Sequence, residues 1–124
     1  QVPAIHNADT LSIDEIMFAL RDITARSRAG EGRLRSSELS DSTITVTNMG
    51  ERGTDLVMGV IYPPQVAIVG LGKPREVPRV EDGKLVVAKV LTVSLSADHR
   101  VIDGMLAAKF LNAIAKQLQK PESL

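Results

Sequence analysis

One histidine lies between charged residues in the most informative segment of this 124-residue sequence. The segment, residues 94–104, reads Ser-Leu-Ser-Ala-Asp-His-Arg-Val-Ile-Asp-Gly and places His99 between Asp98 and Arg100. An imidazole titrates near neutral pH, so a histidine can take a proton from a substrate and return it. Asp98, Arg100 and Asp103 are close enough in sequence to fix the ring and tune its pKa. The segment therefore indicates a candidate general base at His99.

This segment alone also allows simpler structural interpretations of the same residues. A single histidine near acidic residues is more often a surface or hydrogen-bonded structural residue than a catalytic one, and His6 is predicted to be structural. Asp103 precedes a helical pattern, where a carboxylate can cap free N–H groups and is favoured by the helix dipole. A metal site is not predicted, because His99 and Asp103 supply two ligands and nothing nearby completes a set.

The histidine is predicted to lie between a strand and a helix. Residues 77–80 and 85–95 are apolar β-like runs, and the Glu-Asp-Gly-Lys between them is typical of a hairpin turn. From residue 104 to residue 119 the apolar residues recur at helical spacing, and Pro121 follows the end of that pattern. His99 is therefore expected in the short link between these two elements.

The rest of the chain predicts another helix and further strands. Residues 12–29 have helical periodicity, with Ser12 and Glu15 in the form of a capping box and Gly30 at the end. Residues 31–41 are predicted to be a connector with one short helical turn at 37–39, and residues 50–55 a flexible segment. Residues 43–47 and 66–71 are predicted strands, separated by segments that include Pro63-Pro64.

This order of elements predicts an α+β fold with a mixed sheet and flanking helices. The runs at 66–71 and 85–95 are apolar enough for both faces to be covered, by helices or by a neighbouring subunit. With 44% hydrophobic residues the chain can bury a core as one soluble domain, or as a large piece of one. Its 15 basic and 15 acidic residues and the lack of a basic run argue against binding nucleic acid or an anionic membrane. No apolar stretch is long enough to span a bilayer, and the absence of cysteine excludes disulfides and thiolate chemistry.

Four segments together resemble one known family. Asp98-His99-Arg100-Val101-Ile102-Asp103-Gly104 resembles the His-Arg-x-x-Asp-Gly signature of the 2-oxo acid dehydrogenase acyltransferases, whose fold is shared in outline with chloramphenicol acetyltransferase. Residues 2–7 resemble the family's strand before a long helix, residues 44–50 its strand that ends in Asn, an apolar residue and Gly, and residues 62–70 its Asn-Pro-Pro-Gln segment and buried strand. The segments occur in the family's order and cover nearly the whole chain.

The resemblance implies a role for each of three residues in acyl transfer between a lipoyl group and coenzyme A. His99 matches the family's general base, which takes the thiol proton of one substrate. Thr47 matches the Ser or Thr that donates a hydrogen bond to the tetrahedral oxyanion, although on the strand pattern alone it is an ordinary strand residue. Asp103 matches an Asp or Asn that supports the histidine's surroundings. No residue is predicted to bind the cofactor portion of coenzyme A.

The resemblance also implies partners that this chain does not contain. The family's catalytic domain is roughly twice as long, so residues 1–124 are expected to be its C-terminal half and an incomplete domain. The missing parts would include a lipoyl domain with its lipoyl group, and the regions that contact the decarboxylating dehydrogenase and dihydrolipoamide dehydrogenase. A homotrimer, or a larger cubic or icosahedral core, is expected in the bacterial cytoplasm or the mitochondrial matrix. The resemblance implies that His99 and Thr47 of neighbouring subunits form one site at the trimer interface. This chain alone is expected to be poorly active.

Two other functions remain as alternatives. One is a stand-alone acetyltransferase that uses coenzyme A and a small hydroxyl acceptor, which the blocks at 44–50 and 62–70 disfavour. The other is a non-catalytic structural core fragment, which the presence of His99 disfavours for the parent protein. The sequence leaves open the acyl group, which could be acetyl, succinyl or branched-chain, and also the symmetry of the core.

Overall fold

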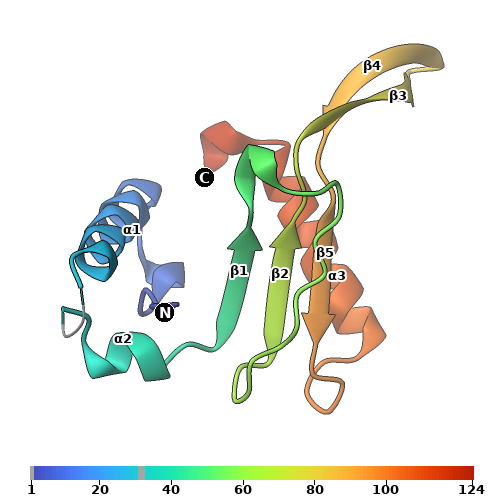
Figure 1. Ribbon diagram of the computed structural model, residues 1–124. Coiled ribbons are helices and arrows are strands. Elements are labelled where there is room, and N and C mark those ends of the chain that lie inside the picture. The colour runs from blue at the N-terminus through green and yellow to red at the C-terminus, as the bar shows by residue number, and fades with distance from the viewer. Residues whose placement is uncertain (1, 31–32) are drawn as a thin grey trace. The chain divides into compact units, whose positions relative to one another are not determined.

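The computed structural model describes residues 2–30 and 33–124, which form two compact units (Figure 1). Unit 1 comprises Gln1–Thr43 and Lys116–Leu124, and unit 2 comprises Ile44–Ala115. The order of helices and strands is that of an α+β chain. None of the described helices is both long enough and apolar enough to cross a membrane.

Unit 1 contains the predicted N-terminal helix, α1 (Ile13–Arg28), and the short α2 (Ser36–Ser40). The capping box is present: the Glu15 N–H donates to Ser12 Oγ at 3.2 Å, and the Ser12 N–H donates to Glu15 Oε2 at 2.7 Å. Of the predicted connector, residues 31 and 32 lie outside the described residues, and α2 is two residues longer than the predicted turn. Two 3₁₀ helices, η1 (Ala8–Thr10) and η3 (Pro121–Ser123), complete the unit.

A partly buried ion pair joins α1 to α2. Arg26 Nη1 donates to Glu38 Oε2 at 2.8 Å, and Nη2 donates to Oε1 at 2.7 Å. Glu38 Oε2 also accepts from the Arg35 N–H at 2.7 Å. The Arg26 hydrogen bonds are the main reason that the pKa of the Glu38 carboxyl is about 2 and not near its ordinary value of 4.5. The pair therefore links two helices across a connector that has few apolar residues.

The strand expected at residues 2–7 does not form in this structure. Residues 2–5 have no regular secondary structure, and the Ala4 N–H donates to the Glu38 carbonyl at 2.6 Å. The described part of unit 1 contains no strand that could pair with this segment, and an extended segment becomes a strand only by pairing. His6 Nε2 lies 3.1 Å from Asp41 Oδ2.

Unit 2 is built on a mixed sheet with the strand order β1-β2-β5. Strand β1 (Ile44–Asn48) is parallel to β2 (Ala67–Leu71), which is antiparallel to β5 (Val93–Ala97). Helix α3 (Gly104–Leu118) begins in this unit and contributes Leu106 and Phe110 to an apolar cavity of about 220 Å³ against the sheet. The apolar face of α3 thus lies toward the sheet as its pattern predicts, although Leu106 and Phe110 remain 50% and 40% exposed in this chain.

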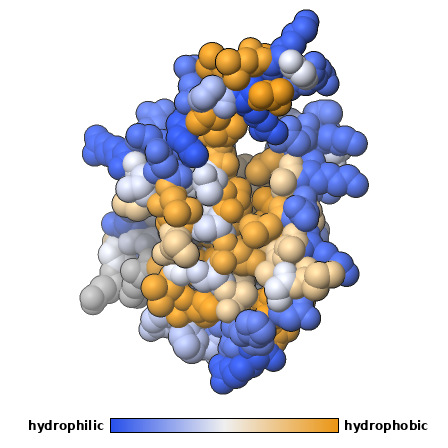
Figure 2. Space-filling model, turned by 90° about the vertical axis from the view of Figure 1, so that its right-hand side faces the viewer, coloured by the Kyte–Doolittle hydropathy of each residue, from blue (hydrophilic) through white to orange (hydrophobic). Residues whose placement is uncertain are grey.

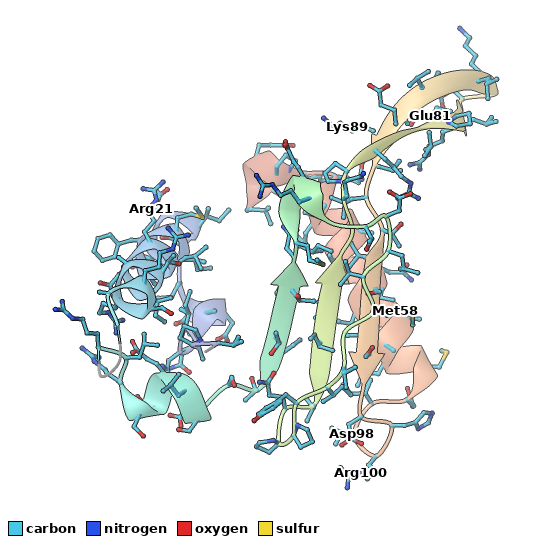
Figure 3. All side chains as sticks on the ribbon, in the orientation of Figure 1. Arg21, Met58, Glu81, Lys89, Asp98 and Arg100 are labelled. Carbon is cyan, nitrogen blue, oxygen red and sulfur yellow. The ribbon has the colours of Figure 1, made fainter. Side chains whose placement is uncertain are left out.

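An extended segment, residues 54–61, crosses the other face of the sheet. Ser94 Oγ donates to the Val57 carbonyl, and Ser96 Oγ donates to the Gly59 carbonyl at 2.7 Å. Gly70 permits this approach, because a Cβ there would lie 2.3 Å from the Val57 carbonyl oxygen. The segment places Met58 on the outside, with 74% of its surface exposed (Figure 3). It is preceded by η2 (Gly50–Arg52), where the sequence predicted a flexible segment.

The predicted hairpin forms, but the strand expected at 85–95 is two strands. Strand β3 (Arg75–Glu81) pairs with β4 (Lys84–Val90), and β5 begins only at Val93. The break at residues 91–92 occurs because the chain changes partner there, from β3 in the hairpin to β2 in the sheet. A periodic pattern cannot show this change, because it records apolarity and not the identity of the partner.

Both faces of β2 are covered within this chain, as predicted, whereas for β4 the predicted cover by a neighbouring subunit stays a prediction. Ala67 and Val69 on one face of β2 are 3% and 5% exposed, and Gly70 on the other face is also buried. Leu85 and Val87 of β4 are 76% and 75% exposed, and Figure 2 shows apolar surface over the hairpin at the top of the view. The chain therefore covers its central strand by itself and leaves the hairpin's outer side chains in solvent.

Candidate functional site

His99 lies in a tight turn between β5 and α3. The Asp98 N–H donates to the Val66 carbonyl at 2.8 Å, which continues the pairing of β2 and β5 by one position. The Asp98 carbonyl then accepts from the N–H groups of Val101 and Ile102, both at 2.9 Å. The predicted link between strand and helix is therefore a closed turn, and His99 is exposed on it.

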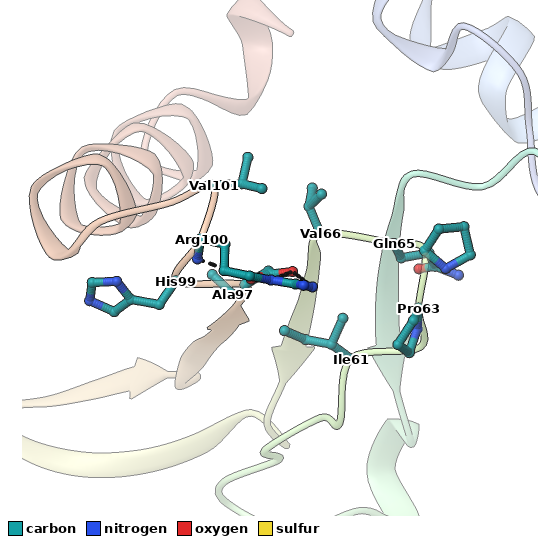
Figure 4. A pocket seen from close by; sticks show the side chains of 10 residues that line it. Ile61, Pro63, Gln65, Val66, Ala97, His99, Arg100 and Val101 are labelled. Carbon is teal, nitrogen blue, oxygen red and sulfur yellow. Dashed lines mark hydrogen bonds and ion pairs between the residues drawn. The ribbon is translucent and has the colours of Figure 1, made fainter.

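The carboxylate of Asp98 binds Arg100 and not the histidine ring. Oδ1 accepts from the Arg100 backbone N–H and from Nε, both at 3.0 Å, and Oδ2 accepts from Nη2 at 2.7 Å. These hydrogen bonds lower the pKa of Asp98 to about 2, so its carboxylate is ionised at neutral pH. Figure 4 shows the His99 ring and the Arg100 side chain leaving the turn in opposite directions.

Asp103 caps α3. Its Oδ1 accepts from the Leu106 N–H at 2.8 Å, and its carbonyl accepts from the Ala107 N–H at 3.0 Å. The interpretation of Asp103 as an N-cap is therefore confirmed. The expectation that the neighbouring carboxylates hold the imidazole is corrected by these contacts, because Asp98 is bound to Arg100 and Asp103 to the helix N-terminus.

A cavity of about 770 Å³ lies beside the turn. One wall is the turn itself, and the other is the segment that leads into β2 and contains the cis Pro63-Pro64 peptide bond. The lining residues most relevant to chemistry are His99, Arg100 and Gln65, among apolar neighbours such as Ile61 and Val66. The Arg100 side chain extends among these residues, whereas the His99 ring points away from them (Figure 4). No group of three or more His, Cys, Asp or Glu among residues 2–30 and 33–124 could hold a metal ion.

The structure does not bring Thr47 to His99 within one chain. Thr47 pairs with Gly70, whereas His99 follows Ala97 at the end of the sheet where Ile44 and Ala67 pair. Three positions along a strand amount to roughly 10 Å, and two strand spacings add roughly 10 Å across the sheet. Since His99 lies beyond that end, the two groups cannot act on one substrate atom from the same chain.

Several residues that shape this region were not singled out from the sequence. Thr45 Oγ1 donates to Gln65 Oε1, which ties β1 to the cavity wall. Ser94 and Ser96 hold the extended segment that leads to Pro63. The alternation Ser-Leu-Ser on a predicted strand was the available signal, because it places both hydroxyls on one face.

Comparisons with known proteins agree on one family. All 124 residues match the family model described as 2-oxoacid dehydrogenases acyltransferase (catalytic domain). The dihydrolipoyllysine-residue acetyltransferase component of the pyruvate dehydrogenase complex from Staphylococcus epidermidis is 40% identical over 123 residues, which are 99% of this chain and 28% of that protein. The same component from Bacillus subtilis is 40% identical over 121 residues, 98% of this chain and 27% of that protein.

Solved structures give the same result. A probable dihydrolipoamide acetyltransferase from Listeria monocytogenes superposes with a TM-score of 0.89 at 35% identity, over 97% of this chain and 50% of that one. The Azotobacter vinelandii dihydrolipoamide acetyltransferase, studied for the catalytic roles of a serine, a histidine and an asparagine, gives 0.85 at 30% identity, over 98% and 49%. The cubic core of a pyruvate dehydrogenase multienzyme complex gives 0.80 at 30%, also over 98% and 49%. The chain thus spans about half the length of the structures that it matches.

Proposed function

The chain belongs to the family of 2-oxoacid dehydrogenase acyltransferases, and we propose that it is the C-terminal half of their catalytic domain, with His99 as general base. The reaction moves an acyl group between a dihydrolipoyl group and coenzyme A, both of which are substrates. We take acetyl as the first acyl group to test, because the matched Staphylococcus and Bacillus relatives are acetyltransferases. The exposure of His99 supports this proposal, because the imidazole stands in solvent on a turn that borders a cavity of about 770 Å³.

The proposed step is a thiol attack on a thioester. His99 takes the proton from the thiol of one substrate, and the sulfur forms a bond to the thioester carbonyl carbon of the other. The carbonyl oxygen becomes an oxyanion, to which the Thr47 hydroxyl donates a hydrogen bond. When the tetrahedral intermediate collapses, the original carbon–sulfur bond breaks and the leaving thiolate recovers the proton from His99. The acyl group has then changed sulfur, with no net gain or loss of protons.

The spacing of the three proposed residues carries the assignment. In the Azotobacter enzyme the serine and histidine studied for catalysis are 52 positions apart, and the asparagine follows the histidine by 4. Thr47, His99 and Asp103 have the same two spacings in this chain. Asp103 would support the site through its cap of α3, which fixes where the turn carrying His99 ends.

We also propose that a complete site is formed by two copies of the protein. The separation of Thr47 and His99 within a chain supports this, because the oxyanion hydroxyl must then come from a neighbour. A homotrimer, alone or within a larger core, supplies such an arrangement, and one of the matched structures is a cubic core. The proposed partners are lipoyl domains, the decarboxylating dehydrogenase and dihydrolipoamide dehydrogenase, which would bind regions outside residues 1–124. We place this assembly in the cytoplasm of a bacterium.

Subunit complementation tests both proposals together. Acetyl transfer from acetyl-CoA to dihydrolipoamide is measured for the full polypeptide that carries these residues, as His99→Ala, as Thr47→Ala, and as the two variants assembled together. Each variant alone should be nearly inactive, and the mixture should recover about a quarter of wild-type activity, because each site draws its two residues from two randomly chosen copies. A mixture no more active than its components would contradict the shared site. Full activity in His99→Ala would contradict the proposed function itself.

A further inference from the structure

Asp98 makes every kind of hydrogen bond that its backbone and side chain allow, and all of them act on the turn that carries His99. Its N–H is bound to Val66 in β2 at 2.8 Å, which anchors the beginning of the turn to the centre of the sheet. Its carbonyl closes the turn by accepting from Val101 and Ile102 at 2.9 Å. These bonds use backbone atoms, so they close the turn whatever the side chain at position 98.

The Asp98 carboxylate adds a third restraint, on the residue directly after the histidine. It accepts from the Arg100 backbone N–H at 3.0 Å and from two nitrogens of the guanidinium, with Nη2 at 2.7 Å. His99 is thus held between two residues that are bonded to each other. The pair holds the Arg100 side chain on one side of the turn, and the imidazole leaves the backbone on the other (Figure 4).

The solvent exposure of the Asp98–Arg100 pair indicates that it contributes little to folding stability. The Asp98 side chain is 21% exposed, but that of Arg100 is 88% exposed. An ion pair with one partner so open to solvent contributes little to folding stability. Its geometric effect does not depend on that contribution, because the bidentate guanidinium and the backbone N–H fix the local conformation.

We propose that Asp98 is a positioning residue for the general base: through Arg100 and the turn, it holds the His99 imidazole in the direction that proton transfer requires. This inference rests on the proposed function of His99 and adds a residue that acts on the base without touching the substrate. Displacement of a reacting group by about 1 Å can lower a rate by about 10²-fold. Loss of Asp98 should therefore lower kcat and leave substrate binding in the cavity nearly unchanged.

Kinetics of the full polypeptide provide the first test. Asp98→Ala should lower kcat for acetyl transfer by about 10²-fold. Asp98→Asn keeps an oxygen that can accept from the Arg100 N–H and should lose only about tenfold, while both variants keep the KM for coenzyme A within about twofold. The matched control is Glu81→Gln, since Arg79 and Glu81 are also two residues apart and lie 3.8 Å from each other in the exposed hairpin. Wild-type kcat in Asp98→Ala would overturn the proposal.

Amide hydrogen exchange provides the second test and does not depend on activity. In Asp98→Ala the N–H of Arg100 should exchange at least about tenfold faster than in the wild type, because its acceptor is gone. The Glu81→Gln control should leave that amide unchanged. If Arg100 is equally protected in both variants, Asp98 does not hold the turn and the inference fails. If the Arg100 amide exchanges faster in Asp98→Ala but His99→Ala retains full activity, Asp98 does hold the turn. The proposed role of His99 is then the part that fails.

Discussion

Two arginine–carboxylate pairs of the same chemistry occur in the two units of this chain. Arg26 and Glu38 in unit 1 and Arg100 and Asp98 in unit 2 both make bidentate hydrogen bonds, and both carboxyl groups have a pKa of about 2. The first pair joins residues 12 positions apart, and Glu38 is 7% exposed. The second joins residues two positions apart, and its arginine is almost entirely in solvent.

The difference shows that an ion pair's role follows from what it connects. Glu38 links separate helices, so its loss frees elements that must otherwise lie together for the unit to fold. Asp98 links neighbours within one turn, so its loss changes the direction of a side chain while the sheet and helix persist. The first pair is therefore expected to determine stability and the second to determine rate.

The largest expected effect is on the rate of acetyl transfer, when His99, which lies between Asp98 and Arg100, is replaced. His99→Ala should lower acetyl transfer by about 10³-fold, because the proposed general base is removed. The midpoint of thermal unfolding should be unchanged, since the imidazole is exposed on its turn. Parallel measurement of turnover and of thermal unfolding by circular dichroism checks both statements. A clear fall in the unfolding midpoint would show that the turn also has a structural role.

The next largest effect concerns the first pair. Glu38→Gln should lower the midpoint of thermal unfolding by several degrees, because it removes the charge of a nearly buried carboxylate and leaves Arg26 with only Asp22 as a charged partner. The amide exchange of Arg100 should stay as in the wild type. Glu81→Gln in the exposed Arg79 pair is the control and should leave the midpoint where it is. Equal midpoints for the two variants would remove the distinction between a linking pair and a surface pair.

Acid sharpens the same distinction. The folded pKa of Glu38 is about 2, below its ordinary value of 4.5, so the unfolded chain binds the proton more readily than the folded chain. The stabilisation is therefore fully present above pH 4.5 and is lost as the pH falls towards about 2. Thermal midpoints of the wild type and of Glu38→Gln should converge over this range. A constant difference between them would mean that this carboxyl is not the source.

The smallest effect is expected where a neutral hydrogen bond, and no ion pair, ties a segment to the sheet. Ser96→Ala removes the donor to the Gly59 carbonyl and should cost about 1 kcal/mol of unfolding free energy, measured by urea denaturation. Ser40→Ala is the control, because the Ser40 hydroxyl is exposed at the end of α2. If Ser96→Ala cost more unfolding free energy than Glu38→Gln in the same urea assay, the crossing segment would matter more to the fold than the Arg26–Glu38 pair.

Local rules predicted the features that depend on neighbours in sequence. The capping box of Ser12 and Glu15, the Asp-Gly turn of the hairpin and the Asp103 cap each require residues within a few positions of one another. Patterns failed where the partner is distant. The break between β4 and β5 and the missing strand at residues 2–7 both depend on which segment is available for pairing.

The candidate site divides in the same way. The sequence alone identified the family, the candidate base His99 and its place between a strand and a helix, because these follow from residue order and local patterns. The family resemblance implied that Thr47 and His99 act from neighbouring subunits, and their separation within one chain agrees with it. Only the tertiary structure showed that Asp98 binds Arg100 and that residues 54–61 cover the sheet. Those facts depend on strand register and on which donors meet which acceptors in space, and a linear pattern specifies neither.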